Sequence, residues 1–128
     1  MQDVINELKK SQSQEECLRK AYDVLILKYH GNRIKTITRI MDFFEHDVDV
    51  LWGKAGFMHC NNINRILKSI LIESGFFKKE DIKTRWTLIW YVSPHQYAQV
   101  RIGGKWIDID IWAHVYGIKF GDYAHGFH

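Results

Sequence analysis

The chain has 128 residues, of which 46% are hydrophobic and 26% are charged, values that are ordinary for a single globular domain. The net charge is only +3 and the basic residues are spread along the sequence, which argues against a nucleic-acid-binding protein. Two cysteines allow one disulfide bond at most, too few for the disulfide framework of a small secreted domain.

The sequence offers no segment for targeting or membrane insertion. Residues 1–16 lack the apolar core of a signal peptide, and no apolar run approaches the ~20 residues that span a bilayer. No linker, internal repeat or low-complexity tract interrupts the chain. We therefore expect one domain over 1–128 in the cytoplasm, with neither a membrane nor a nucleic acid among its partners.

Apolar residues recur at helical spacing throughout the first half. Residues 1–12 predict a short amphipathic helix. The next helix is predicted to begin with a capping box formed by Ser13 and Glu16 and to be stopped by Gly31. A further helix is predicted over 32–46, where apolar residues again mark one face.

The most strongly patterned helix starts at His59 or Cys60. It is predicted to run to Ser74, with Gly75 as its C-terminal cap. A continuous apolar stripe predicts that this helix is the most buried one. The stripe consists of Ile63, Ile66, Leu67, Ile70 and Leu71.

The second half is rich in β-branched and aromatic residues and predicts antiparallel strands. A strand is expected over 82–92, interrupted at Ser93-Pro94. A hairpin follows, with Gly103-Gly104 as its two-residue turn. The predicted pairs on its apolar face are Val100 with Ile107 and Ala98 with Ile109. Helices first and strands after them indicate an α+β fold.

The other face of the predicted hairpin is polar. Continuing the register pairs Tyr97 with Asp110 and His95 with Trp112, so His95 and Asp110 become diagonal neighbours about 7–8 Å apart. That separation predicts a hydrogen bond between the imidazole and the carboxylate. Asp108, expected opposite Gln99, would reach His95 only if a bulge shifted the register.

Cys60 is the candidate nucleophile. The N-terminus of a helix carries partial positive charge that stabilises a thiolate, and its free N–H groups can stabilise an oxyanion. A lone cysteine in a small domain is more often an inert buried side chain, and Cys17 is interpreted as one. The combination of Cys60 with His95 and Asp110 favours the catalytic interpretation.

These residues together resemble the transglutaminase-like superfamily, on the papain-like cysteine-enzyme scaffold. The matching segments are Gly56-Phe-Met-His-Cys60, His95-Gln-Tyr97, Gly103-Gly104 and Trp106-Ile-Asp-Ile-Asp110, and the likeness extends over roughly 17–112. It implies N-terminal helices, with the nucleophile helix packed on a small antiparallel sheet. It also implies that Cys60 is the nucleophile, that His95 is the general base and acid, and that Asp110 orients the imidazole.

The resemblance implies acyl transfer on peptide or protein amides through a thioester. Hydrolysis by a protease or deamidase is the favoured branch, because a small domain offers little surface for two protein substrates. An amine-accepting cross-linker and a non-catalytic peptide-binding module stay open as alternatives. The chain departs from the family at Tyr97, where tryptophan is usual, at Gln99, where an acid is common, and at His59, where small or acidic residues are typical.

Three further residues are candidates for substrate binding. Trp52 could donate to an oxyanion or wall the acyl pocket, or it could simply pack. Asn61, with Asn62 beside it, could line the site or cap the helix, and Tyr97 could stack on substrate or pack in the sheet. No histidine pair has the spacing of a zinc motif, so we expect neither a metal nor another cofactor.

Overall fold

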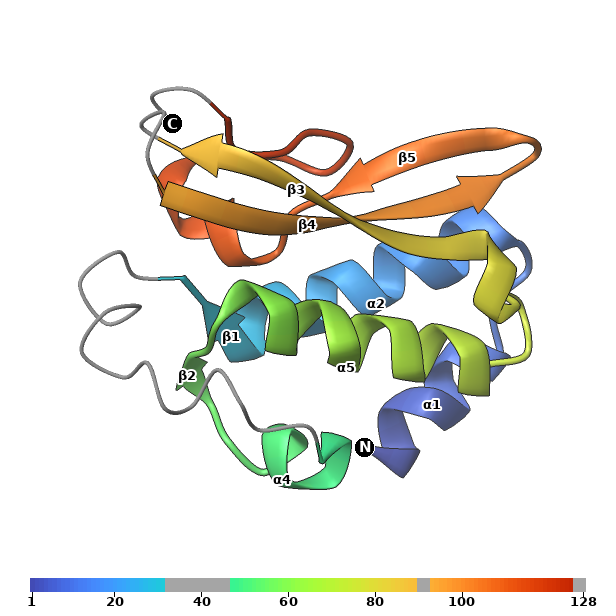
Figure 1. The fold of residues 1–128 in the computed structure, drawn as a ribbon. Coiled ribbons are helices and arrows are strands. Elements are labelled where there is room, and N and C mark those ends of the chain that lie inside the picture. Colours follow the sequence, from blue (N-terminus) through green and yellow to red (C-terminus); the bar gives the residue numbers. More distant parts are fainter. Residues whose placement is uncertain (32–46, 90–92, 126–128) are drawn as a thin grey trace.

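The computed structural model describes residues 1–31, 47–89 and 93–125. Helices lie below a sheet (Figure 1), so the fold belongs to the α+β class. The helices are α1 (Gln2–Lys9), α2 (Gln14–Lys28), α4 (Val48–Trp52) and α5 (Cys60–Glu73), with the 3-10 helices η2 (Lys79–Asp81) and η3 (Trp112–Tyr116). The strands are β1 (Tyr29–His30), β2 (Gly56–Phe57), β3 (Ile82–Ile89), β4 (Ser93–Ile102) and β5 (Lys105–Ile109).

Helix α2 begins at the predicted capping box. The hydroxyl of Ser13 accepts a hydrogen bond from the Glu16 N–H at 3.1 Å, while the Glu16 carboxylate accepts from the backbone of Gln12 at 2.7 Å. The predicted stop at Gly31 was too late, because the helix ends at Lys28 and the chain continues as the short strand β1. The helix predicted over 32–46 lies outside the described residues.

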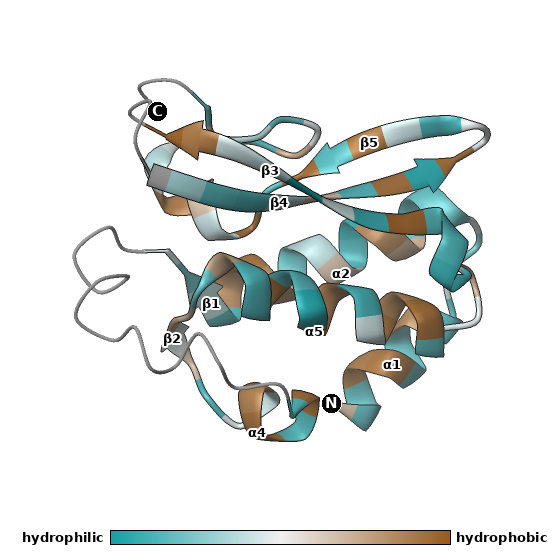
Figure 2. Cartoon of the chain, in the orientation of Figure 1, coloured by the Kyte–Doolittle hydropathy of each residue, from teal (hydrophilic) through white to brown (hydrophobic). Residues whose placement is uncertain are grey.

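Helix α5 forms as predicted, from Cys60 to Glu73, with Gly75 at a φ of 86° just beyond it. Every residue of the predicted apolar stripe is fully buried. Hydrophobic residues recur along α2 and α5 and alternate with hydrophilic ones along β5 (Figure 2). The core therefore lies between the helices and the sheet, where α5 packs against both α2 and β4.

Strand β4 is the centre of a three-stranded antiparallel sheet, with β3 on one side and β5 on the other. The predicted pairs Val100 with Ile107 and Ala98 with Ile109 are confirmed. The described part of the predicted strand over 82–92 is β3, which pairs with β4 from Ile82 to Ile89. The hairpin turn is Gly103-Gly104, both at positive φ.

The predicted ladder was wrong beyond Ile109. Pairing ends with Ala98 and Ile109, so Tyr97 does not pair with Asp110 and His95 does not pair with Trp112. The physical reason is a local turn: Ile111 adopts helical angles (φ −67°, ψ −40°) and opens η3. The Asp110 carboxylate stabilises this turn by accepting the N–H of Ala113 at 3.2 Å.

A second, two-stranded sheet joins the end of α2 to the segment that enters α5. Strands β1 and β2 run parallel, with Tyr29 opposite Gly56 and His30 opposite Phe57. The N–H of Met58 continues the contact by donating to the His30 carbonyl at 3.2 Å. None of the helices in the described ranges combines the length and the apolar character needed to cross a membrane.

Candidate active site

Cys60 is the first residue of α5, and β2 determines where that helix begins. The pairing of β2 with β1 fixes the backbone three residues before Cys60, and His59 then takes an extended conformation (φ −65°, ψ 148°) as the N-cap. The Cys60 side chain is a free thiol and is only half-buried. The thiol therefore lies at the positively polarised end of the α5 helix dipole.

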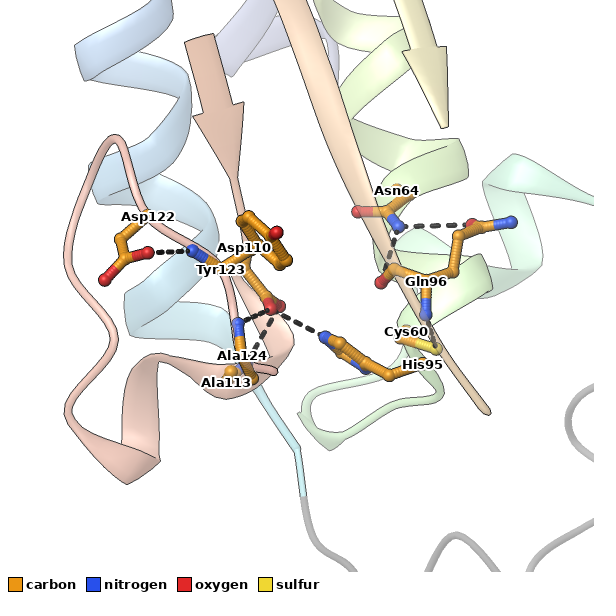
Figure 3. A network of polar contacts seen from close by, with 9 residues as sticks. All are labelled: Cys60, Asn64, His95, Gln96, Asp110, Ala113, Asp122, Tyr123 and Ala124. Atoms are coloured by element: carbon orange, nitrogen blue, oxygen red, sulfur yellow. Dashed lines mark hydrogen bonds and ion pairs between the residues drawn. The ribbon is translucent and has the colours of Figure 1, made fainter. Parts of the chain in front are cut away.

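His95 lies on β4 and contacts Asp110 directly (Figure 3). Its Nε2 lies 2.6 Å from Oδ2 of Asp110, and the two side chains are 2% and 1% exposed. The predicted imidazole–carboxylate hydrogen bond is therefore present. It does not arise from diagonal strand neighbours, because Asp110 follows the last residue of β5, where the chain is already turning into η3.

The thiol of Cys60 meets β4 beyond the end of β5. The part of β4 that precedes Ala98 has no partner on β5, and there the N–H of Gln96 donates to Sγ of Cys60 at 3.4 Å (Figure 3). The imidazole of His95 also interacts with the Cys60 side chain. Since Nε2 is taken by Asp110, the ring nitrogen left for the thiol is Nδ1. Early termination of β5 thus leaves this edge of β4 open to the Cys60 thiol.

The surroundings of His95 favour its protonated form. Burial lowers the pKa of the imidazole, but the hydrogen bond to Asp110 and the interaction with Cys60 outweigh it and raise the pKa to about 9. A protonated imidazole beside the sulfur is the counter-ion that a thiolate needs. The same proton is available for transfer to a leaving group.

Two backbone N–H groups hold the Asp110 carboxylate. Ala113 donates to Oδ1 at 3.2 Å, and Ala124, far along the C-terminal segment, donates to Oδ2 at 2.8 Å. Both contacts are buried, and together they hold both carboxylate oxygens in place. Sequence reasoning missed them, because a backbone N–H has no residue-type signature.

The ring of Trp112 covers His95, with ring centroids 4.9 Å apart. This arrangement depends on Gly31, whose N–H donates to the Trp112 carbonyl at 2.8 Å. A Cβ added at Gly31 would lie 2.2 Å from the Trp112 ring, so no larger residue fits. The sequence predicted Trp112 beside His95, but as a strand partner and not as a residue of η3.

Asn64 connects the two elements that carry Cys60 and His95. It lies one turn after Cys60 on α5, is 4% exposed, and donates its amide to the Gln96 carbonyl at 3.2 Å and to the Gln96 side-chain oxygen at 3.1 Å (Figure 3). Gln96, the residue after His95, is therefore tied to helix α5, which begins with Cys60. The spacing i, i+4 from Cys60 was the available sequence signal for Asn64.

The three residues predicted for substrate binding have different surroundings. Trp52 packs with Tyr29 at a ring separation of 6.5 Å and lies under the ammonium of Lys28 at 4.7 Å. Tyr97 is 7% exposed and stacks on Tyr123 at 4.0 Å. Asn61 is half-buried and follows Cys60 directly on α5. The contacts found for Trp52 and Tyr97 are those of packing.

Two other candidates of the sequence are also placed. Asp108 accepts a hydrogen bond from the Gln99 amide at 2.7 Å, as expected for neighbours across the hairpin. Cys17 is fully buried, and its Sγ lies 3.5 Å from the hydroxyl of Ser74. Within ranges 1–31, 47–89 and 93–125, no three His, Cys, Asp or Glu residues are grouped as a metal site would require.

The site thus brings together a half-buried thiol, a buried imidazole and a buried carboxylate from α5, β4 and the turn after β5. Such a set can perform nucleophilic acyl transfer. Comparison of the chain with protein-family models, with curated proteins and with solved structures found no match.

Proposed function

We propose that this chain is a cysteine-dependent enzyme of papain-like, transglutaminase-like type, which transfers the acyl group of a peptide or protein amide through a thioester. One observation supports this proposal most strongly. The buried imidazole of His95 has its Nε2 2.6 Å from Asp110 while it also interacts with Cys60. An imidazole oriented by a carboxylate and next to a thiol suits nucleophilic catalysis.

In the first half of the reaction, the Cys60 thiolate attacks the amide carbonyl carbon and forms a C–S bond. The carbonyl oxygen becomes an oxyanion, for which the N–H groups at the start of α5 are suitable donors. Collapse of this intermediate breaks the C–N bond. His95 gives its proton to the departing nitrogen, so an amine or ammonia leaves and a thioester remains on Cys60.

In the second half, a water molecule attacks the thioester while neutral His95 takes one of its protons. The C–S bond breaks, the carboxylic acid leaves, and the thiolate–imidazolium pair returns. Attack by an amine in place of water would form a new amide and give the cross-linking reaction. Hydrolysis is the branch we favour, because a 128-residue chain presents little surface for two protein substrates.

A panel of amide substrates, incubated with and without a small primary amine, tests the proposal. Release of amine or ammonia should occur with the wild type and with Cys17→Ala, and it should be lost in Cys60→Ala. Incorporation of the added amine would select the cross-linking branch. If the wild type and Cys60→Ala bind peptide equally and neither turns it over, the protein is a peptide-binding module and not an enzyme.

A further inference from the structure

The C-terminal segment returns to the carboxylate that holds His95. Ala124 is 2% exposed, and its N–H donates at 2.8 Å to Oδ2 of Asp110, the same oxygen that lies 2.6 Å from the imidazole. The two residues lie 14 positions apart in the chain, so this contact is not part of a local turn. One carboxylate oxygen thus receives a donor from the sheet and a donor from the C-terminal segment (Figure 3).

Tyr123 anchors that segment to the strand of His95. Its ring stacks on Tyr97 with centroids 4.0 Å apart and an interplanar angle of 11°. Tyr97 follows His95 by two residues on β4, so the stack ties the segment to the same part of the sheet. Aromatic stacking of this kind contributes roughly 0.5–1.5 kcal/mol beyond the area that it buries.

A second anchor holds the segment on the helices. The ring of Phe120 packs edge-on against Tyr22 at 5.3 Å and lies under the guanidinium of Arg19 at 4.3 Å. Ile118 is also buried, at 4% exposure. The path of the chain toward Ala124 is therefore fixed from both sides, by α2 and by β4.

We propose that residues 121–125 form a strap whose Ala124 amide sets the orientation of the Asp110 carboxylate, with Tyr123 as its anchor. A carboxylate can rotate about its Cβ–Cγ bond, and of the two backbone donors that limit this rotation, the Ala113 N–H acts on Oδ1. The Ala124 N–H acts on Oδ2. Ala124 and Tyr123 are then positioning residues that act on His95 through Asp110.

Four single substitutions in the full chain isolate this role. Ala124→Pro removes the N–H donor, and Ala124→Gly is the matched control that keeps it. Tyr123→Ala removes the stack on Tyr97, and Tyr123→Phe keeps it. Folding of each variant is first checked by far-UV circular dichroism and by its amide NMR spectrum.

The readout is the proton on Nε2 of His95, followed by NMR in protein with ¹⁵N-labelled histidine. Its exchange with water should be slow in the wild type, in Ala124→Gly and in Tyr123→Phe. Exchange should become about tenfold faster in Ala124→Pro, the factor expected when one hydrogen bond to a charged group is lost, and it should increase less in Tyr123→Ala. A folded Ala124→Pro variant with wild-type exchange would overturn the proposal.

If Ala124→Pro does not fold, the exchange rate of the His95 Nε2 proton in Tyr123→Ala tests the proposal instead. A folded Tyr123→Ala variant with faster exchange supports the strap, and one with wild-type exchange overturns it. If neither variant folds, the segment is required for the fold and not for orientation, so the positioning role is again overturned.

The effect of the strap on turnover rests on the proposed function and is tested separately. Ala124→Pro should slow turnover in the wild-type background and should add no further loss to Asp110→Ala, because both act on one carboxylate. Independent, additive losses would contradict action through Asp110. If the wild type shows no Cys60-dependent turnover, the proposed function fails, while the His95 proton still reports on the strap.

Discussion

The two cysteines of this chain occupy opposite kinds of environment. Cys17 lies inside α2, fully buried, and burial raises the pKa of its thiol despite the nearby Ser74 hydroxyl. Cys60 begins α5, is half-buried, and meets the N–H of Gln96 and the imidazole of His95. The same side chain is therefore a packing group in one place and a candidate nucleophile in the other, and the difference is made by neighbouring polar groups.

The largest effect should come from removing His95, the proposed general base beside Cys60. His95→Ala should lower amide turnover by roughly 10²–10⁴-fold, the usual contribution of a general acid–base. His114→Ala is the matched control, because His114 is exposed and its ring contacts the edge of Tyr22, with centroids 6.3 Å apart. Steady-state kinetics measures amide turnover in both variants. Equal losses of turnover would mean that His95 has no special role in the reaction.

Alkylation should separate the two thiols by a somewhat smaller factor. We expect iodoacetamide at pH 6 to modify Cys60 on the order of 100 times faster than Cys17, because Cys60 is half-buried beside the imidazole of His95, whereas Cys17 is fully buried and burial raises the pKa of its thiol. Peptide mass spectrometry gives the two rates. His95→Ala should slow the reaction at Cys60 and leave Cys17 unchanged. Similar rates at the two cysteines would mean that Cys60 is not activated.

The pH dependence of stability should reveal the His95–Asp110 pair. Because the folded-state pKa of His95 is about 9, above its ordinary value of 6.5, the pair stabilises the fold fully below pH 6.5. That contribution, roughly 1–3 kcal/mol, should be lost as the pH rises through 9. Urea unfolding of the wild type and of Asp110→Asn between pH 6 and pH 10 measures it. A difference between the two proteins that does not change with pH would contradict the raised pKa.

The smallest expected effect is on the free energy of unfolding, and it compares how much each cysteine contributes to packing. Cys17→Ala should lower the free energy of unfolding by about 1 kcal/mol, because it leaves a small void in a fully buried site. Cys60→Ala should change it by less, since the side chain is half-buried. Chemical denaturation compares the two variants. A larger loss at Cys60 would show that this residue is part of the core.

The parts of the fold that follow local rules could be predicted from the sequence. The capping box at Ser13, the buried stripe of α5 and the hairpin register around Gly103-Gly104 each depend on residues close together in the chain. The contact between His95 and Asp110 was also predicted, but by a wrong route. A strand ladder was extended through Asp110, where a side chain that accepts the Ala113 N–H turns the chain instead.

The parts that depend on distant backbone groups could not be predicted. The Ala124 amide reaches Asp110 from a segment without periodicity, and alanine gives no sign that its N–H is a donor to that carboxylate. The close approach of Gly31 to Trp112 likewise joins residues far apart in the chain. Only a small residue fits where two distant segments approach closely, as at Gly31. A single sequence does not show which segments approach each other.

The most direct test of the central claim is to trap the acyl group. The wild type is mixed with a short-chain activated ester and quenched in acid, and mass spectrometry then locates the added acyl mass. We predict a thioester on Cys60, labile to hydroxylamine, absent from Cys60→Ala and strongly reduced in His95→Ala, with Cys17 unmodified. Acylation of Cys17, or no thioester on Cys60 in folded wild-type protein, would contradict the account.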